Sequence, residues 1–466
     1  LGDSEHSIPG ARRRRPVALR EPGREVVADG SEDVGQAVDH VSGHPACAGI
    51  SSRRRNGRAA PKRHAYDPGP SLTVVGQWHR GFVIVRYRYR AYPTSAQAAM
   101  LARTFGCARV VYNDAIRLRD ACYEAGVKLS DTEIQRRVIT AAKQTAEREW
   151  LSEVASVALV QSCQDAARAY RNWFDSLSGK RKGRKVGRPR MKRRRERQSV
   201  RLTRNGFSIR SDGRIYLAKI GEVKVRWSRT LASEPSSVTV ILEPDGRYYL
   251  SFCVERETQP LWVIDHEAGI DLGLSRLLTT SEGEIVDNPR FLRRRQRKLA
   301  CLQRATSRKQ KGSANRRKAS KRVAVAHRKV REARLDHAHK TALRLIRENQ
   351  AVYAEDLAIY GLARTRLSKS VHDAGWSQLL RLLAEKAEHY NRTFVQIGRF
   401  VPTSQICSEC GWIDGPKPLS IRTWTCQCGA VHDRDVNAAR NILAAGQAER
   451  LNACGERVSP STRAAA

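Results

Sequence analysis

Two pairs of closely spaced cysteines near the C-terminal end of the chain constrain its fold more than any other feature. Cys407 and Cys410 form the first pair and Cys426 and Cys428 the second, with fifteen residues between the pairs. Four thiols at such spacing predict a zinc site. The second pair leads directly to Asp435 at an expected helix start, so a zinc-bound turn would hold that carboxylate in place.

The helix expected after Asp435 is predicted to end near Gly446, because glycine is common where helices stop. Its apolar stripe consists of Ala438, Ala439, Ile442 and Leu443. The helix dipole would keep a carboxylate at this end ionised. Taken alone, Asp435 is equally explained as an N-cap.

The charge of the chain indicates a polyanionic partner. Lysine and arginine outnumber aspartate and glutamate 86 to 47 in 466 residues, which gives a formal net charge of +39. A basic footprint of this size is typical of nucleic-acid binding. No run reaches the roughly 18–20 apolar residues of a membrane-spanning helix, and no signal peptide is recognisable, so no membrane partner is expected. Seven of the eleven cysteines are scattered, which suits a reducing cytosol with one metal site.

Both ends of the chain are predicted to be disordered. Residues 1–81 are rich in Pro, Gly, Ser and His, have arginine runs and show little periodic apolar content. Such a segment cannot bury enough surface to offset its ordering entropy. Alternatively, this extension is a basic arm that reinforces nucleic-acid binding. Residues 447–466 are expected to form a disordered tail.

Alternating strand patterns predict a small antiparallel barrel from residues 82–94 and 199–260. Residues 83–89 alternate in character, and six further strand patterns follow after the helical region. Asn-Gly and Asp-Gly pairs suit tight hairpins at 205–206, 212–213 and 245–246. The first strand has a cationic face, whose predicted nucleic-acid-binding residues are Arg86, Arg88 and Arg90.

A helical lobe, residues 95–198, is inserted after the first barrel strand. Thr94-Ser95 offers an N-cap, and further helical segments are expected over 107–125, 131–148 and 151–177. The lobe ends in a Gly- and Pro-containing basic loop, residues 179–197. Its cation density favours contact with a phosphate backbone over a plain solvated linker. The predicted contact residues are Lys185, Arg188, Arg190 and Lys192.

Two more carboxylates lie on apolar elements in the same half of the chain as Asp435. Asp271 interrupts an expected strand, and Glu355 ends another. Three converging acids raise one another's pKa values unless a cation binds, whereas two divalent ions about 4 Å apart remove that penalty and can clamp a phosphodiester. Carboxylates select Mg²⁺ or Mn²⁺. Taken singly, Asp271 is also explained as half of a buried ion pair with an arginine, and Glu355 as a strand-end charge.

Residues 289–349 are predicted to form two long basic helices broken near Gly312-Ser313. Like charges at helical spacing repel one another, so an anionic partner is expected to stabilise these helices. Representative predicted contact residues are Arg294, Arg316 and Arg317. An amphipathic helix over 376–390 and a strand over 393–397 precede the cysteines.

Six motifs, in their order and spacing, resemble the TnpB family. These are OrfB-type insertion-sequence proteins, ancestral to the compact type V CRISPR effectors. Four motifs are short: Tyr92-Pro-Thr, Gly187-Arg-Pro-Arg-Met-Lys192, Gly269-Ile-Asp-Leu-Gly273 and Glu355-Asp-Leu357. The two C-terminal motifs, residues 404–411 and 432–442, are highly specific. The resemblance covers nearly everything after the N-terminal extension.

The resemblance implies a multidomain α+β protein that is an RNA-guided DNA endonuclease of a transposon. It implies an antiparallel wedge barrel with an inserted helical recognition lobe, which starts like a helix-turn-helix within 83–126. An RNase H-like RuvC α/β domain (261–402 and 431–446) would follow, with a zinc ribbon (403–430) inserted. Asp271, Glu355 and Asp435 would be the catalytic Mg²⁺-binding triad, and the four cysteines would hold zinc. The implied partners are a transposon-derived guide RNA and double-stranded target DNA, in the cytoplasm of a prokaryote, associated with the nucleoid.

The second cysteine pair departs from the family pattern, which usually has two residues between the thiols of each pair. Cys426-Gln-Cys428 has one, so His432 is an alternative zinc ligand in place of one thiol. Two rival functions stay open. One is a non-cleaving DNA- or RNA-binding regulator or transposase accessory protein on the same scaffold. The other, a zinc-ribbon RNA-binding protein of ribosomal type, leaves Asp271 and Glu355 without a purpose.

Overall fold

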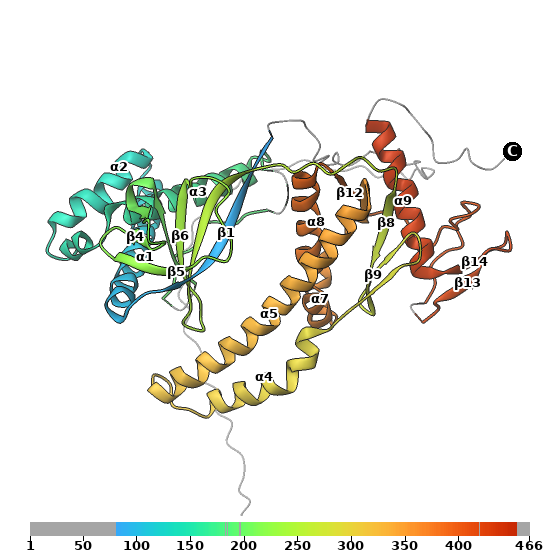
Figure 1. The fold of residues 1–466 in the computed structure, drawn as a ribbon. Helices are drawn as coiled ribbons and strands as arrows, with labels where there is room; N and C mark the ends of the chain where they lie inside the picture. Colours follow the sequence, from blue (N-terminus) through green and yellow to red (C-terminus); the bar gives the residue numbers. More distant parts are fainter. Residues whose placement is uncertain (1–80, 182, 184, 195–196, 419, 454–466) are drawn as a thin grey trace, which may run out of the picture. The chain divides into compact units, whose positions relative to one another are not determined.

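The computed structural model describes residues 81–453 except 182, 184, 195–196 and 419 (Figure 1). The disorder expected for residues 1–81 and 447–466 lies outside the described residues except at 81 and 447–453. It is wrong for 447–453, which are helical. Within them the strands form a seven-stranded antiparallel sheet, a five-stranded mixed sheet and a two-stranded ribbon. None of the described helices has the length and apolar character needed to cross a membrane.

The seven-stranded sheet confirms the predicted antiparallel barrel. Its strand order is β2-β6-β7-β1-β5-β4-β3, with β1 paired to β7 and β5. The edge strands β2 and β3 are joined by a short 3₁₀ turn, Arg204–Gly206, so the sheet nearly closes on itself. The strands are β1 (Phe82–Tyr92), β2 (Gln198–Thr203), β3 (Phe207–Ile209), β4 (Ile215–Leu217), β5 (Gly221–Arg226), β6 (Ser237–Leu242) and β7 (Tyr248–Glu257).

The inserted helical lobe consists of α1 (Ser95–Glu124), α2 (Asp131–Gln135) and α3 (Ser156–Leu177). Thr94 caps α1 through a capping box with Gln97, as predicted. The helical segment expected over 131–148 is confirmed as far as Gln144 and is wrong beyond it. Only α2 is α-helical, and the chain continues as a π-helix, Arg136–Ala141, and a 3₁₀ turn, Ala142–Gln144. The wider π turn lets Ile134, Val138 and Ile139 all join the core between α1 and α3.

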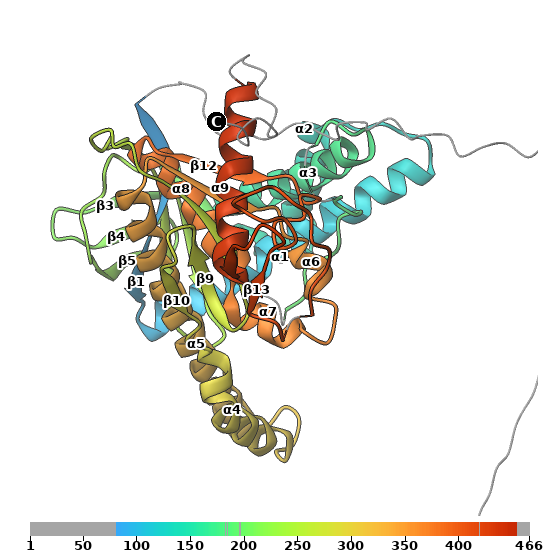
Figure 2. The ribbon, with the colours of Figure 1, turned by 90° about the vertical axis from the view of Figure 1, so that its right-hand side faces the viewer.

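The five-stranded sheet has the order β10-β9-β8-β11-β12, in which β8, β11 and β12 are parallel. The strands are β8 (Glu267–Leu272), β9 (Arg276–Thr280), β10 (Ile285–Asp287), β11 (Ala351–Glu355) and β12 (Thr393–Ile397). One face packs on α5 (Ala314–Glu348), α7 (Ser368–Ala374) and α8 (Trp376–Tyr390). The other face packs on α9 (Arg434–Ala453), which lies toward the viewer in Figure 2.

Two basic helices connect β10 to β11, as predicted. α4 (Phe291–Ser307) and α5 lie side by side as an antiparallel pair (Figure 1). The break between them ends at Ser313, whose hydroxyl caps α5 by accepting a hydrogen bond from the backbone of Arg316. The short helix α6 (Ile359–Leu362) follows β11, and the ribbon strands are β13 (Thr423–Thr425) and β14 (Val431–Asp433).

Two glycines let α9 approach the five-stranded sheet closely. A Cβ on Gly269 of β8 would lie 2.1 Å from the backbone oxygen of Ala439, and one on Gly446 would lie 2.1 Å from the ring of Tyr353. The prediction that α9 ends near Gly446 is therefore wrong. This glycine lies inside a helix that continues to Ala453, because the Tyr353 ring fills the space of the missing side chain.

Candidate active site and metal centre

Parallel pairing of β8 and β11 places Asp271 beside Glu355. Ile270 is in register with Ala354, so the next residue on each strand is one of the two carboxylates. Residues in register on neighbouring strands point to the same side of a sheet. Asp435 comes from the first turn of α9, which packs against β8. The structure thus brings the three predicted acids to one edge of the sheet.

The electrostatics of Asp271 show that the other two acids act on it. Burial, together with the charges of Glu355 and Asp435, raises the pKa of Asp271 to about 7. Among the described residues no arginine or lysine lies within ion-pair distance of Asp271, and the nearest opposing influence is that of Arg434. The alternative of a buried ion pair is therefore wrong.

Glu355 is held from the neighbouring loop. The Thr403 hydroxyl donates a hydrogen bond to its carboxylate. Burial raises the pKa of Glu355, and this hydrogen bond offsets part of the shift. A half-buried, hydrogen-bonded carboxylate does not behave as a solvated strand-end charge, so the simpler alternative for Glu355 fails as well.

The N-cap of α9 is Asp433. One of its carboxylate oxygens accepts hydrogen bonds from the backbone N–H groups of Asp435 (3.0 Å) and Val436 (3.1 Å). Asp435 therefore has no capping role, and its carboxylate faces other side chains. The alternative that Asp435 serves only as the cap is wrong.

Two arginines that the sequence did not single out contact Asp435. The guanidinium of Arg422, in the ribbon, lies 3.0 and 3.2 Å from the two carboxylate oxygens. Arg276, at the start of β9, lies 3.6 Å from Asp435 and 3.3 Å from Asp433. Nothing in their spacing distinguishes these arginines in so basic a chain. Only the fold shows that they belong to the site.

The four predicted cysteines form a compact cluster. Their sulfur atoms all lie within 4.8 Å of one another, with 3.8 Å between Cys407 and Cys428 and 3.6 Å between Cys410 and Cys426. A tetrahedral zinc with Zn–S bonds of about 2.3 Å requires sulfur separations of about 3.8 Å. The donor set and its spacing therefore fit zinc, and the one-residue gap before Cys428 does not misplace its thiol.

His432 supports this cluster from its side. The ring nitrogen Nε2 lies 3.1 Å from the sulfur of Cys407, and both residues are buried. The ring also packs against Trp424, with centroids 4.8 Å apart. The four thiols by themselves supply the four donors of a tetrahedral site, which leaves the imidazole as a hydrogen-bond partner of Cys407.

Two asparagines on α9 attach the ribbon to the site. The side chain of Asn437 accepts a hydrogen bond from the backbone of Ser408 and donates one to the carbonyl of Ile406. One turn later, Asn441 donates to the carbonyls of Ile406 and Thr403. Thr403 also bonds Glu355, and Arg422 of the ribbon contacts Asp435. The residues that attach the ribbon to α9 are therefore linked by hydrogen bonds and ion pairs to two of the three carboxylates.

The predicted nucleic-acid-binding residues have varied surroundings. Arg88 pairs with Glu243 at 2.6 Å and stacks over the Tyr249 ring, while Arg188 pairs with Asp120 at 2.8 Å. The remaining surface members are Arg86, Lys185, Arg190, Arg294 and Arg317, all exposed, and Arg90 and Arg316, which are partly buried. Contact of these residues with nucleic acid stays a prediction.

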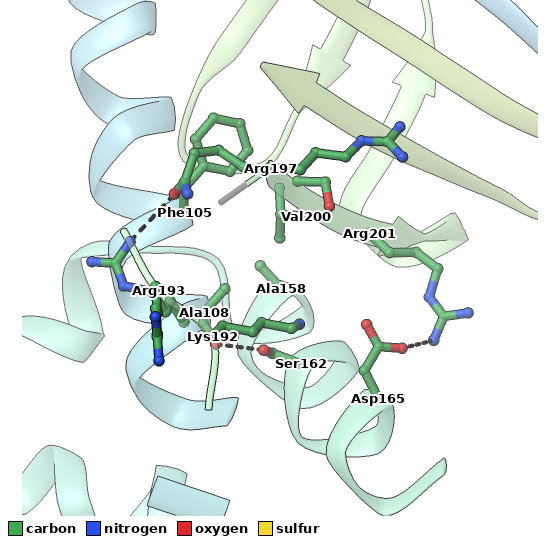
Figure 3. Close-up of a pocket in the computed structure, with 13 residues that line it drawn as sticks. Phe105, Ala108, Ala158, Ser162, Asp165, Lys192, Arg193, Arg197, Val200 and Arg201 are labelled. Atoms are coloured by element: carbon green, nitrogen blue, oxygen red, sulfur yellow. Dashed lines mark hydrogen bonds and ion pairs between the residues drawn. The ribbon is translucent and has the colours of Figure 1, made fainter. Parts of the chain in front are cut away.

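Lys192 is half-buried between the basic loop and the helical lobe. Its ammonium group lies 4.0 Å from the centroid of the Tyr112 ring, and burial lowers its pKa. The Asn113 side chain bonds both the N–H (2.8 Å) and the carbonyl (3.0 Å) of Lys192. Figure 3 shows the lysine extending past Ala108 toward Ser162. This part of the loop is therefore fastened to α1 rather than freely solvated.

The fold is of the Cas12f1 type. A solved structure, "Cryo-EM structure of the Cas12f1-sgRNA-target DNA complex", matches 78% of this chain and 99% of its own, with a TM-score of 0.52 and 11% sequence identity. Family models described as "Helix-turn-helix domain", "Probable transposase" and "Cas12f1-like, TNB domain" match residues 83–128, 251–366 and 376–442. The first of these ranges contains β1 and the single helix α1.

Two bacterial proteins with similar sequences show which family the chain belongs to. A protein of Streptomyces pristinaespiralis named "Putative RNA-guided DNA endonuclease" is 42% identical over 379 residues, 80% of this chain and 92% of the relative. Escherichia coli K12 has "Putative RNA-guided DNA endonuclease InsQ", 30% identical over 80% of this chain and 94% of its own length. The chain belongs to the TnpB family of OrfB-type insertion-sequence proteins.

Proposed function

We propose that this protein is an RNA-guided DNA endonuclease that cleaves phosphodiester bonds at Asp271, Glu355 and Asp435. The placement of these three acids at one edge of the five-stranded sheet, by the register of β8 with β11 and by the start of α9 against β8, carries the proposal. The names of the bacterial relatives support it, as do the sgRNA and target DNA that the Cas12f1 complex contains. A non-cleaving regulator on the same scaffold would not need Asp271 to be held where burial and the charges of Glu355 and Asp435 raise its pKa.

The five-stranded sheet, with its parallel strands β8, β11 and β12 flanked by antiparallel β9 and β10, supports the assignment of a RuvC-type domain to residues 261–402 and 431–453. Residues 403–430 are then a zinc ribbon inserted into it. The barrel (82–94 and 199–260) and the helical lobe (95–198) are proposed to hold the guide RNA and the DNA beside it. The family setting favours a transposon-derived guide and action in the cytoplasm of a prokaryote.

The three carboxylates supply hard oxygen donors, which select Mg²⁺ or Mn²⁺, and such a cation would offset the charges that Glu355 and Asp435 exert on Asp271. When bound, these ions activate water and stabilise the charge that develops on the phosphodiester oxygens. Thr403 orients Glu355, and Asp433 caps α9 so that Asp435 remains available. Arg422 and Arg276 place positive charge where a backbone phosphate would approach Asp435.

Cleavage of guide-matched DNA tests the proposal. Protein purified with its bound RNA is expected to cut DNA that matches that RNA when Mg²⁺ is present. Asp271→Ala is expected to abolish cutting while RNA binding persists, since Asp271 lies apart from the basic loop and the barrel. If the wild type binds RNA and leaves matched DNA intact with both Mg²⁺ and Mn²⁺, the protein is a binding regulator instead.

A further inference from the structure

The loop between β12 and the ribbon, residues 398–403, is tied to the catalytic edge at both ends. At one end the Arg399 guanidinium donates to the backbone oxygen (3.0 Å) and the carboxylate (2.7 Å) of Asp356, the residue after Glu355. At the other end Thr403 donates to Glu355 itself. Hydrogen bonds to Asp356 and Glu355 therefore hold both ends of the loop beside the carboxylate that is proposed to be catalytic.

Phe400 lies in the middle of this loop and projects into solvent. Its side chain is 94% exposed, more than any other large apolar side chain in the described part of the molecule. Consecutive Cα atoms are about 3.8 Å apart, so its backbone lies within about 11 Å of Thr403, which touches Glu355. Single exposed apolar residues are common on protein surfaces. This one is distinguished by its place beside the carboxylates and next to an arginine.

Arg399, the residue before Phe400, is one of the residues that line an open groove of about 580 Å³. Its lining includes the apolar side chains of Leu380 and Phe394, the guanidinium groups of Arg381 and Arg399, and Asp356, whose carboxylate is paired with Arg399. Arg399 uses two of its five N–H donors on Asp356, which leaves donors for a further anion. An apolar surface edged by guanidinium groups matches a nucleotide, which has an apolar base face and an anionic phosphate.

We propose that Phe400, Arg399 and this groove form a subsite for one unpaired nucleotide of the DNA strand being cut. The inference rests on the proposed function and adds a base-stacking residue to it. Phe400 stacks on the base of a nucleotide close to the scissile phosphate, and Arg399 contacts the adjoining phosphate. Only an unpaired nucleotide fits, because base faces are covered inside a duplex. Stacking here would hold the strand while its phosphodiester lies at the carboxylates.

A cleavage series with single abasic sites tests the subsite. The guide-RNA complex is given matched DNA in which one nucleotide near the cut at a time lacks its base. For the wild type, one abasic position is expected to slow cutting about fivefold or more, as loss of one stacked base does. Phe400→Ala is expected to slow cutting of intact DNA by a similar factor. In this variant, removal of the base at the sensitive position should cause no further loss of rate. Phe400→Trp should keep the wild-type profile, and Phe400→Leu should behave as the alanine variant.

Trp262 supplies the matched control. Its ring is also exposed (92%), but it precedes β8, at the end of that strand opposite to Asp271, so Trp262→Ala should leave the abasic profile unchanged. A second measurement does not require cutting. With Asp271→Ala protein, 2-aminopurine at the sensitive position is expected to be quenched in the complex and brighter when Phe400→Ala is added.

The outcomes separate this subsite from the nuclease proposal. If the wild type cuts, and Phe400→Ala shows the same rate and the same abasic profile, the subsite is excluded while the endonuclease stands. If the wild type never cuts, the endonuclease proposal falls. In that case 2-aminopurine is placed at each position in turn, and a fluorescence that Phe400→Ala never changes excludes the subsite as well.

Discussion

The raised pKa of Asp271 makes the stability of the metal-free protein depend on pH. The ordinary pKa of this carboxyl is 3.8, and in the folded protein it is about 7. Between these values the folded state keeps a proton that the unfolded state releases, so folding is favoured at low pH. The contribution is therefore present below about pH 4 and lost as the pH rises through 7.

Asp271→Asn removes this dependence, because the amide stays neutral at every pH. In EDTA the variant is expected to be as stable as the wild type near pH 4 and more stable near pH 8, by on the order of a few kcal/mol. Urea unfolding at the two pH values measures the difference. Added Mg²⁺ should reverse the order at the higher pH, because the wild type alone keeps all three carboxylates. An equal effect of the substitution at both pH values would contradict the proton linkage.

Arg422 is expected to matter for cleavage and not for assembly. Its guanidinium group contacts the carboxylate of Asp435 at 3.0 Å, so it would lie near a phosphate bound at the carboxylates. The side chain is about half exposed, so it contributes little to packing. Arg422→Ala should lower the single-turnover cleavage rate by about 100-fold, as removal of a charge-stabilising donor does. Arg422→Lys should recover part of the rate. An unchanged rate for the alanine variant would assign Arg422 a structural role only.

Zinc content tests the cysteine cluster residue by residue. The wild type is expected to hold one zinc per chain, and Cys428→Ser should lose it, because all four thiols share one cluster. His432→Gln should retain it, since the imidazole bonds to the sulfur of Cys407. Elemental analysis of the three proteins is the measurement. If the serine variant retained zinc and the glutamine variant lost it, His432 would be the fourth ligand instead of Cys428.

The sequence identified the carboxylates and failed to identify the cations around them, for a physical reason. Asp271 and Glu355 sit in apolar strands, where a charge has a large desolvation cost and therefore attracts notice. Arg422 and Arg276 are two among 86 basic residues, and no local pattern separates them from solvated ones. Their role depends on how the ribbon and β9 are placed against α9.

Among the elements, the position of α9 depends on Gly269. A Cβ at this position would overlap the Ala439 backbone oxygen and lie 2.6 Å from the nitrogen of Leu443, so neither contact can be relieved by a side-chain rotation. Gly269→Ala is expected to destabilise the protein by about 1–3 kcal/mol, as overpacking does. It should also lower cleavage, because α9 carries Asp435. Thermal unfolding and cleavage rate measure the two effects.

Gly106 is the matched control for that substitution. It lies inside α1, and a Cβ there would meet nothing within 4 Å. Gly106→Ala should stabilise the protein by about 0.5–1 kcal/mol through helix propensity. If both alanine variants changed stability in the same direction, close packing at Gly269 would not be the cause.

The regular elements were predictable to the extent that their own periodicity determines them. The barrel strands and the break between α4 and α5 follow from alternation and from a capping serine. The π and 3₁₀ turns within 136–148 were not predictable from the sequence, because they depend on how Val138 and Ile139 pack in the core. The length of α9 was not predicted correctly because a glycine at 446 is typical of a helix end. The structure shows that this glycine instead makes room for the ring of Tyr353.

At the scale of the molecule, a buried ion pair joins the barrel to α5. The guanidinium of Arg328 lies 2.7 Å from the carboxylate of Asp245, in the turn between β6 and β7, and also bonds Glu332. Arg328 and Asp245 are both buried. One turn of helix further on, Arg331 reaches Glu243 of the same hairpin at 3.4 Å but is half exposed. These contacts connect the sheet that carries the carboxylates, through α5, to the barrel.

Removing Arg328 should therefore cost much more stability than removing Arg331. Arg328→Met leaves the buried Asp245 with only the longer contact to the half-exposed Arg247, at 3.5 Å, and the expected loss is about 3 kcal/mol. Arg331→Met removes a half-exposed arginine and leaves the buried Glu243 paired with Arg88 at 2.6 Å, so it should cost less than about 1 kcal/mol. Adding Asp245→Asn to Arg328→Met should restore part of the loss, because the remaining partner is then neutral. Urea unfolding of the four proteins decides the matter. Equal losses for the two arginine variants would mean that burial of the pair is not what holds α5 against the barrel.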